Sequence, residues 1–389
     1  MLIRWISVLL HGYVGFRLLP AMSWSFGAAS LLVSLLMSVW AMPMGIGLRT
    51  IIANSTSTRG RTARPALVWL GWLMMGLFSS LLVLTVLRDT LLLLWEAIDS
   101  LGPLVPHVGW EQTHMAWSRW SALATWVLAL AITAFGFLGA RRTATVVEVT
   151  VPILNLPLPL QGFRIVQISD VHVGPTIRAD YVQRIVGAVN GLRADMVAIT
   201  GDLVDGSVSA LREQVAPLAQ LQSRHGSFFV TGNHEYYSGA TEWVAELRRL
   251  GMHVLMNQHQ LLAHDAAEVV VAGVTDFGAV HFDPAQRSDP QKAINDAPAS
   301  AGVRILLAHQ PRSAAAAAAA GFDLQLSGHT HGGQFLPWNF FVRLQQPFVA
   351  GLHRLQQLWI YTSRGTGYWG PPKRFGAPSE ITLLRLVAA

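Results

Sequence analysis

Three long stretches without a single charged residue constrain the fold of this chain most strongly. They run from Trp24 to Met44, from Ala66 to Leu87 and from Trp120 to Gly139. A helix needs about 20 mostly apolar residues to cross the hydrocarbon core of a bilayer, and each stretch is that long. The sequence therefore predicts a membrane-spanning helix over each of these ranges.

Residues 1–20 are predicted to form a fourth span. They carry Arg4 and Arg17 near their two ends, where long basic side chains can reach the interface. A cleaved signal peptide is the alternative, but the stretch has no clear small-residue cleavage site. The prediction is a four-helix transmembrane bundle within residues 1–140. Spans two to four carry no charge, which favours an anchor over a transporter.

The loops between the spans predict an orientation. Four arginines and no acid lie between the second and third spans, whereas four acids lie between the third and fourth. These arginines are Arg49, Arg59, Arg61 and Arg64. Arg141 and Arg142 follow the last span. Because basic loops stay in the cytoplasm, we expect both chain ends and the domain after residue 140 to be cytoplasmic.

The rest of the chain has the composition of a soluble domain. Residues 1–140 hold only 8 of the 28 basic and 4 of the 22 acidic residues. No run of Lys and Arg with interleaved aromatic residues occurs, so we expect no nucleic-acid partner despite the net charge of +6. The chain contains no cysteine, so any metal must be held by nitrogen and oxygen atoms.

Strand and helix patterns alternate in this second part. Residues 141–162 predict a linker with an entry strand at Val146–Val151. Further strands are predicted at Phe163–Ile168, Met196–Thr200, Phe228–Thr231, Val269–Val274, Val303–Ala308, Asp323–Ser327, Trp359–Ser363 and Ile381–Val387. Helices are predicted at Asp180–Leu192, Leu211–Leu221, Thr241–Leu250 and Ala314–Ala320. The alternation predicts an α/β domain with a largely buried sheet over residues 163–389.

Metal-ligand residue types follow five of the predicted strands, where each strand ends. They are Asp170 and His172, Asp202 and Asp205, Asn233 and His234, His309, and His329 and His331. Each piece alone is more often a turn or a structural histidine. Their joint occurrence is informative, because ligands bind beyond the carboxyl ends of strands in α/β sheets.

The number of donors predicts two cations rather than one. The set is too large for one tetrahedral site, and a shared carboxylate between two ions about 3.5–4 Å apart is the usual way to build a binuclear hydrolytic centre. Mixed nitrogen and oxygen ligands without sulfur favour Mn, Fe or Zn over Ca or Mg.

These motifs resemble the calcineurin-like metallophosphoesterase superfamily. The resemblance rests on Asp170-Val171-His172, Gly201-Asp202-Leu203-Val204-Asp205, Gly232-Asn233-His234-Glu235, His309 and Gly328-His329-Thr330-His331, which together cover about residues 163–333. It implies an α/β sandwich of two mixed β-sheets flanked by helices. It also implies a binuclear metal-dependent hydrolase of phosphate or diphosphate esters, phosphodiesters included.

The resemblance also implies roles for individual residues. The first metal would be bound by Asp170, His172 and His331, Asp202 would bridge, and the second metal would be bound by Asn233, His309 and His329. His234 would protonate the leaving group or steady the phosphate, and Asp205 would orient His234.

The C-terminal part resembles the membrane-tethered bacterial branch of the superfamily, over Tyr361–Gly367 and Arg374–Glu380. Some members act on the lipid precursor UDP-diacylglucosamine, and others are generic phosphoesterases. This resemblance implies a bacterial inner-membrane protein with a phosphoester substrate that is lipid-linked, and with membrane lipids as partners.

Two further features bear on the substrate. Arg364, Lys373 and Arg374 are candidates for binding a diphosphate or a lipid headgroup, with surface or membrane-facing charges as the alternative. The aromatic segment Phe335–His353 is predicted to dip into the interface or hold acyl chains, with a cap packed on the sheet as the alternative. For the whole protein, a non-catalytic metal-binding scaffold and a regulatory domain of a membrane protein stay open as alternatives to the enzyme.

Overall fold

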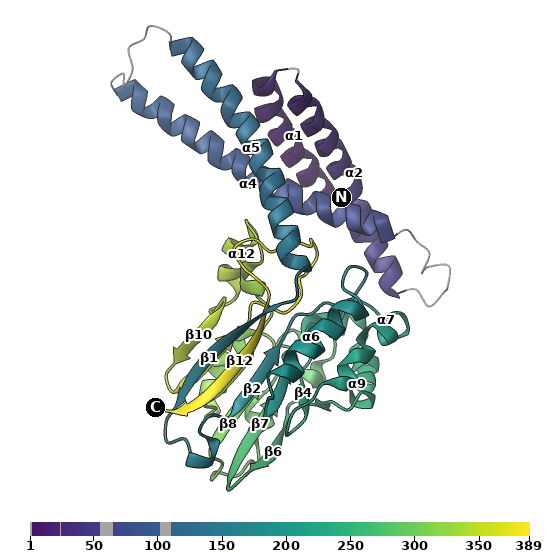
Figure 1. The fold of residues 1–389 in the computed structure, drawn as a ribbon, viewed down its shortest axis with the longest axis vertical. Helices are drawn as coiled ribbons and strands as arrows, with labels where there is room; N and C mark the ends of the chain where they lie inside the picture. Colours follow the sequence, from purple (N-terminus) through teal and green to yellow (C-terminus); the bar gives the residue numbers. More distant parts are fainter. Residues whose placement is uncertain (1, 24, 55–64, 102–109) are drawn as a thin grey trace. The chain divides into compact units, whose positions relative to one another are not determined.

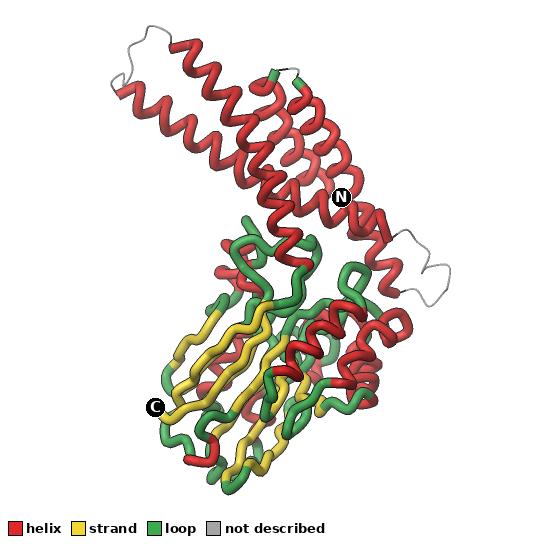
Figure 2. Tube along the Cα trace, viewed as in Figure 1, coloured by secondary structure: helices red, strands yellow, loops and turns green. Residues whose placement is uncertain are grey.

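The computed structural model describes residues 2–23, 25–54, 65–101 and 110–389. The chain divides into two compact units (Figures 1 and 2). The helical unit consists of Met1–Arg49, Arg64–Leu138 and the short segment Gly370–Phe375. The α/β unit is formed mainly by Gly139–Trp369 and Gly376–Ala389.

In the described part of the chain, four long helices build the helical unit. They are α1 (Leu2–Met22), α2 (Phe26–Asn54), α4 (Pro65–Leu101) and α5 (Trp110–Arg141). Leu18, Leu31, Leu81 and Trp126 are among the buried residues at their centre. Within the described residues, three helices are long and apolar enough to cross a membrane, over Phe26–Pro43, Ala66–Leu101 and Gln112–Arg141. Helix α1, which we expected to span as well, is not among them. Of the arginines used to predict the orientation, Arg59, Arg61 and Arg64 lie outside the described residues.

Charged side chains directly after the predicted span Ala66–Leu87 are buried inside the helical unit. Helix α4 continues past Leu87, so Arg88 and Asp89 lie within it, and both are 7 % exposed. Asp89 accepts hydrogen bonds from Arg17 Nε at 2.7 Å, Tyr13 Oη at 2.7 Å and Arg88 Nη1 at 2.9 Å. Arg17 therefore pairs with a carboxylate instead of only reaching toward the interface, because a buried charge needs a partner of opposite sign.

Two mixed six-stranded sheets form the centre of the α/β unit. The first has the order β1-β12-β2-β3-β4-β5 and the second has the order β10-β11-β9-β8-β7-β6. The strands of the first sheet are β1 (Thr145–Ile153), β12 (Glu380–Ala388), β2 (Arg164–Ile168), β3 (Met196–Ile199), β4 (Ser227–Phe229) and β5 (His253–Val254). Those of the second sheet are β10 (Gly351–Leu355), β11 (Leu358–Thr362), β9 (Leu324–Ser327), β8 (Val303–Leu307), β7 (Ala267–Gly273) and β6 (Gln258–His264). Strands β2 to β5 are parallel, as are β7, β8, β9 and β11.

Helices cover the outer faces of the two sheets. The outer faces are covered by α6 (Ala179–Gly191), α7 (Val208–Val215), α9 (Ala240–Arg249), α10 (Pro290–Ile294) and α11 (Ala314–Ala319). The unit also contains α8 (Asn233–Ser238) and α12 (Trp338–Gln345). Short 3₁₀ turns lie at Leu158–Leu160, Ala216–Gln220, Ala279–His281, Pro284–Gln286, Pro311–Ser313 and His331–Gly333. Residues of α6, α7 and α9 share a buried cluster with β2 and β3, and residues of α10 and α11 share another with β8 and β11.

The facing sides of the two sheets are buried against each other. Ile165 and Ala198 of the first sheet share one apolar cluster with Val271, Ile305 and Leu326 of the second. With its outer helices, the unit is an α/β sandwich of two mixed sheets. The predicted strands and the alanine helix are present, whereas β5, β6 and β10 were not predicted. These three are edge strands, and edge strands are short or polar and so give a weak apolar pattern.

Candidate metal centre

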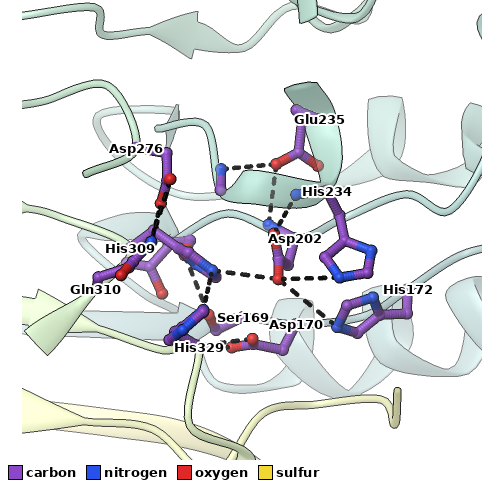
Figure 3. Close-up of polar contacts among 12 residues, drawn as sticks. Ser169, Asp170, His172, Asp202, His234, Glu235, Asp276, His309, Gln310 and His329 are labelled. Carbon is purple, nitrogen blue, oxygen red and sulfur yellow. Dashed lines mark hydrogen bonds and ion pairs between the residues drawn. The ribbon is translucent and has the colours of Figure 1, made fainter. Parts of the chain in front are cut away.

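The carboxyl ends of parallel strands bring the predicted ligands together (Figure 3). Asp170 and His172 follow β2, Asp202 and Asp205 follow β3, His309 follows β8, and His329 and His331 follow β9. Asn233 and His234 follow β4 and begin helix α8. Strands β2, β3 and β4 belong to the first sheet, and β8 and β9 belong to the second. The site therefore lies where both sheets end.

Backbone conformation at the site is unusual. Five of the seven predicted metal ligands have positive φ angles, which non-glycine residues rarely adopt. They are Asp170 (53°), His172 (55°), Asp202 (51°), His329 (69°) and His331 (51°). Such left-handed residues cluster at functional sites, where the surrounding structure holds a strained backbone so that side chains point in one direction.

Close packing holds the two site carboxylates against the backbone. Asp170 accepts from His329 N at 2.9 and 3.0 Å, and Asp202 accepts from His234 N at 2.8 Å. A Cβ atom on Gly328 would clash with Asp170 Oδ2, and one on Gly232 would clash with Asp202 Oδ1. Both positions therefore require glycine, because any side chain would clash with a site carboxylate.

Asp202 lies at the centre of the ligand set. Its Oδ2 is 3.2 Å from His309 Nε2, 3.9 Å from His172 Nε2 and 4.0 Å from His234 Nε2. The Asp202 side chain is only 3 % exposed. A carboxylate oxygen surrounded by three imidazole nitrogens is suited to share a cation with more than one of them.

One candidate group consists of Asp170, His172 and His331. Their ligand atoms lie within 4.8 Å of one another. His331 Nε2 is 3.4 Å from Asp170 Oδ1 and 3.0 Å from His172 Nε2. Burial raises the pKa of Asp170. Gathering these donors in a buried site without a cation is costly, so the group fits a divalent ion.

A second group consists of Asp202, His309 and His329, also within 4.8 Å of one another. His309 Nδ1 lies 2.7 Å from Thr200 O, which can only accept, so Nδ1 carries the hydrogen and Nε2 faces Asp202 and His329. Burial opposes the charged form of His309, but the carboxylate of Asp202 outweighs it and raises the pKa of His309 well above its ordinary value. A cation bound here would take the place of that proton.

Asn233 adds an oxygen donor whose hydrogen-bonding capacity is unused. Its Oδ1 is buried and has no hydrogen-bond partner in the described part of the chain. A buried polar atom without a partner costs free energy, so a native structure normally supplies one. The orphaned Asn233 Oδ1 beside His234 therefore fits the oxygen ligand that the sequence predicts at this position.

Asp205 contacts two histidines at once. Its Oδ1 is 2.5 Å from His234 Nδ1 and 3.3 Å from His172 Nδ1. A carboxylate accepts from both rings, so each Nδ1 carries a hydrogen and each Nε2 faces Asp202. The sequence predicted the contact with His234 but not the one with His172.

Two buried acids at the site were not predicted. Glu235 accepts from the backbone N–H groups of Gly232, Leu203 and Asp202 at 2.7, 2.8 and 3.0 Å, and so fixes the loop that carries Asp202. Asp276 follows β7 and accepts from Gln310 Nε2 at 2.9 and 3.1 Å. Both had a signal in the sequence, since Glu235 ends a motif and Asp276 follows a predicted strand.

The three predicted substrate-binding bases are divided between the two units. Arg364 pairs with Glu380, with Nη1 2.9 Å from Oε2. Lys373 belongs to the helical unit, where Nζ donates to Gly76 O at 2.7 Å and to Ser80 Oγ at 2.5 Å. Lys373 and Arg374 are 2 % and 4 % exposed, so both are buried, and their role in binding a substrate stays a prediction.

Comparisons with known proteins agree with this geometry. Residues 163–333 match the family model described as calcineurin-like phosphoesterase. The chain is 41 % identical over 275 residues to a transmembrane protein with metallophosphoesterase domain from Danio rerio, covering 68 % of this chain and 63 % of that protein. It is 39 % identical over 310 residues to the protein of the same description from Bos taurus, covering 77 % and 68 %. An uncharacterized metallophosphoesterase from Aquifex aeolicus is 33 % identical, covering 57 % and 84 %. The chain thus spans less than two thirds of the length of the Danio rerio relative.

Proposed function

Because this chain belongs to the calcineurin-like phosphoesterase family, we propose that it is a membrane-anchored, metal-dependent hydrolase of phosphate or diphosphate esters. The convergence of Asp170, His172, Asp202, His309 and His331 at one buried site carries this proposal. Side chains separated by up to 161 positions along the sequence gather only where the fold selects for them, and four of these five, all except His309, have strained backbone.

Two divalent cations, Mn, Fe or Zn, would be held by Asp170, His172 and His331 and by Asn233, His309 and His329, with Asp202 shared. Bound there, the cations would neutralise phosphoryl oxygens and lower the pKa of water, which supplies a nucleophile at neutral pH.

The protein's own side chains would then bind, orient and move a proton. His234 Nε2 faces the shared carboxylate oxygen at 4.0 Å, which suits a proton donor to the leaving oxygen or a hydrogen bond to the phosphate. Asp205 holds the Nδ1 side of the His234 ring, so the ring cannot turn away. We propose His234 as the catalytic acid and Asp205 as its positioning residue.

A lipid-linked substrate such as UDP-diacylglucosamine is supported by apolar residues near His234. The His234 ring lies 6.4 Å from the Trp369 ring, which lies 6.5 Å from Trp338 on α12. Helix α12 has no buried residue, and Phe341 and Leu344 are 54 % and 83 % exposed. A helix packed as a cap on the sheet would bury a face, so the helix suits acyl chains or a lipid surface better.

The location we propose is the bacterial inner membrane, with residues 1–140 as the anchor and residues 163–389 as a cytoplasmic catalytic domain joined by residues 141–162. Three described helices are apolar enough to span, and two relatives are named transmembrane proteins. A reporter fused after Ala389 is expected to be active only in the cytoplasm. A reporter active only outside the cytoplasm would refute this orientation.

Activity is tested on purified full-length protein in detergent with added Mn²⁺. Wild type, Asp202→Asn and His234→Ala are compared on a chromogenic phosphodiester and on UDP-diacylglucosamine, with metal content measured for each protein. Turnover by wild type that both variants lose supports the hydrolase, and the preferred substrate decides between a lipid enzyme and a generic esterase. Wild type that binds about two metals per chain and turns over neither substrate would favour the scaffold or regulatory alternatives.

A further inference from the structure

Arg312 is a positively charged residue beside the metal centre that the sequence motifs do not include. It follows His309 by three positions, after β8, and its side chain is exposed. Its hydrogen-bond partner Gln310 directly follows the predicted ligand His309, and both lie among the residues of the site in Figure 3.

Arg312 is held in place by neutral groups. Its Nε donates to Gln310 Oε1 at 2.6 Å, and its guanidinium carbon lies 4.3 Å from the centre of the Phe277 ring. Gln310 is itself 2 % exposed, and its Nε2 donates to both carboxylate oxygens of Asp276, so Gln310 Oε1 is turned toward Arg312. The stack and the Nε bond fix the guanidinium plane and leave both Nη groups for a ligand.

The charge of Arg312 is not balanced by a protein carboxylate. Among the described residues, no acidic side chain lies within ion-pair distance of its guanidinium, whereas Arg364 has Glu380 at 2.9 Å. A guanidinium that is fixed in place, has no acid partner and lies beside a proposed site for phosphoric esters is suited to bind two phosphate oxygens at once.

We propose that Arg312 binds a phosphate group of the substrate from the His309 and His329 side of the centre. This inference rests on the proposed function and names a specificity residue within it. The bound group is either the phosphate under attack or the second phosphate of a diphosphate, and the two cases give different kinetic results.

Arg312→Gln and Arg312→Lys are made in the full-length protein, with Arg354→Gln as the matched control. Arg354 also stacks on an aromatic ring, Trp359, at 5.4 Å and bonds a neutral oxygen, but it lies on the β10–β11 hairpin. KM and kcat are measured with Mn²⁺ on the chromogenic phosphodiester and on UDP-diacylglucosamine. Binding of inorganic phosphate to the Mn²⁺-loaded proteins is measured separately by calorimetry.

Arg312→Gln is expected to raise KM and the phosphate dissociation constant about 10- to 100-fold, with a smaller change in kcat. Arg312→Lys should recover part of the loss, because the charge is kept and the two-point fork is lost. A rise in KM on both substrates means that Arg312 binds the phosphate under attack. A rise in KM on the diphosphate substrate alone means that Arg312 binds its second phosphate. Arg354→Gln should match wild type.

Wild-type KM and wild-type phosphate affinity in Arg312→Gln, with metal content unchanged, would overturn the inference. If wild type itself turns over neither substrate, the proposed function fails. The calorimetric comparison then still tests whether Arg312 binds phosphate, so the two failures are distinguishable.

Discussion

Replacing Asp205 by Asn tests the central positioning contact of the site. Asp205 Oδ1 accepts from the Nδ1 groups of His234 and His172 at 2.5 and 3.3 Å, and the substitution keeps the shape but removes the charge. A hydrogen bond with a charged partner contributes about 1.5–3 kcal/mol and one between neutral groups about 0.5–1.5 kcal/mol, so each contact loses about 1–1.5 kcal/mol. The two contacts together lose about 2–3 kcal/mol, which corresponds to about a 30- to 150-fold fall in kcat/KM.

The assay is kcat/KM for the chromogenic phosphodiester at saturating Mn²⁺, with bound metal counted in the same preparations. Asp195→Asn is the matched control. Asp195 also accepts a partly buried hydrogen bond, from Arg164 N at 2.8 Å, but it lies at the end of β3 away from the metal site. The control should stay within about twofold of wild type, as expected of a substitution away from the site.

A result within threefold of wild type for Asp205→Asn, with full metal content, would refute the reasoning. It would mean that the rings of His172 and His234 keep their orientation without the carboxylate. A large loss of metal with little loss of activity per bound metal would mean that Asp205 helps to retain the metals and does not position the proton donor His234.

Three further outcomes are expected. Chelating the metals should lower the melting temperature of the protein, because a ligand present at 100 times its dissociation constant stabilises the fold by about 2.7 kcal/mol. An unchanged melting temperature in a calorimetric scan would contradict this expectation. Glu235→Gln should lower the free energy of unfolding of the α/β unit by about 1–3 kcal/mol in chemical denaturation, because an amide NH₂ would face one of three backbone N–H donors. A loss below about 0.5 kcal/mol would contradict this expectation. Asp89→Asn should lower stability in detergent by about 1–3 kcal/mol, less than for a fully buried pair because the Arg17 side chain is 38 % exposed. Glu96→Gln, with a side chain 54 % exposed, is the control, and equal melting temperatures for the two variants would contradict the expectation.

The sequence predicted those parts of the α/β unit whose signal is local. Buried parallel strands appear as short apolar runs, and the ligands directly follow them, as with Asp170 after β2 and His309 after β8. The edge strands β5, β6 and β10 were missed because an edge is paired on one side only and needs no continuous apolar run. The left-handed backbone at Asp202 has no local signal either, since these conformations are imposed by the surrounding packing.

What the sequence could not reveal is which charges cancel. Arg17 is paired with Asp89, 72 positions away, and Arg364 with Glu380, 16 positions away. In the sequence each of these arginines looks as available as Arg312, and Arg364 was chosen as a candidate for binding phosphate. The role of Arg364 stays a prediction, but its buried carboxylate partner reduces the net field that a ligand would feel. An arginine held by an amide oxygen and an aromatic ring keeps its full charge for a ligand. The same reasoning identifies candidate anion sites in other chains, where the informative arginine is the one whose position is fixed by neutral groups.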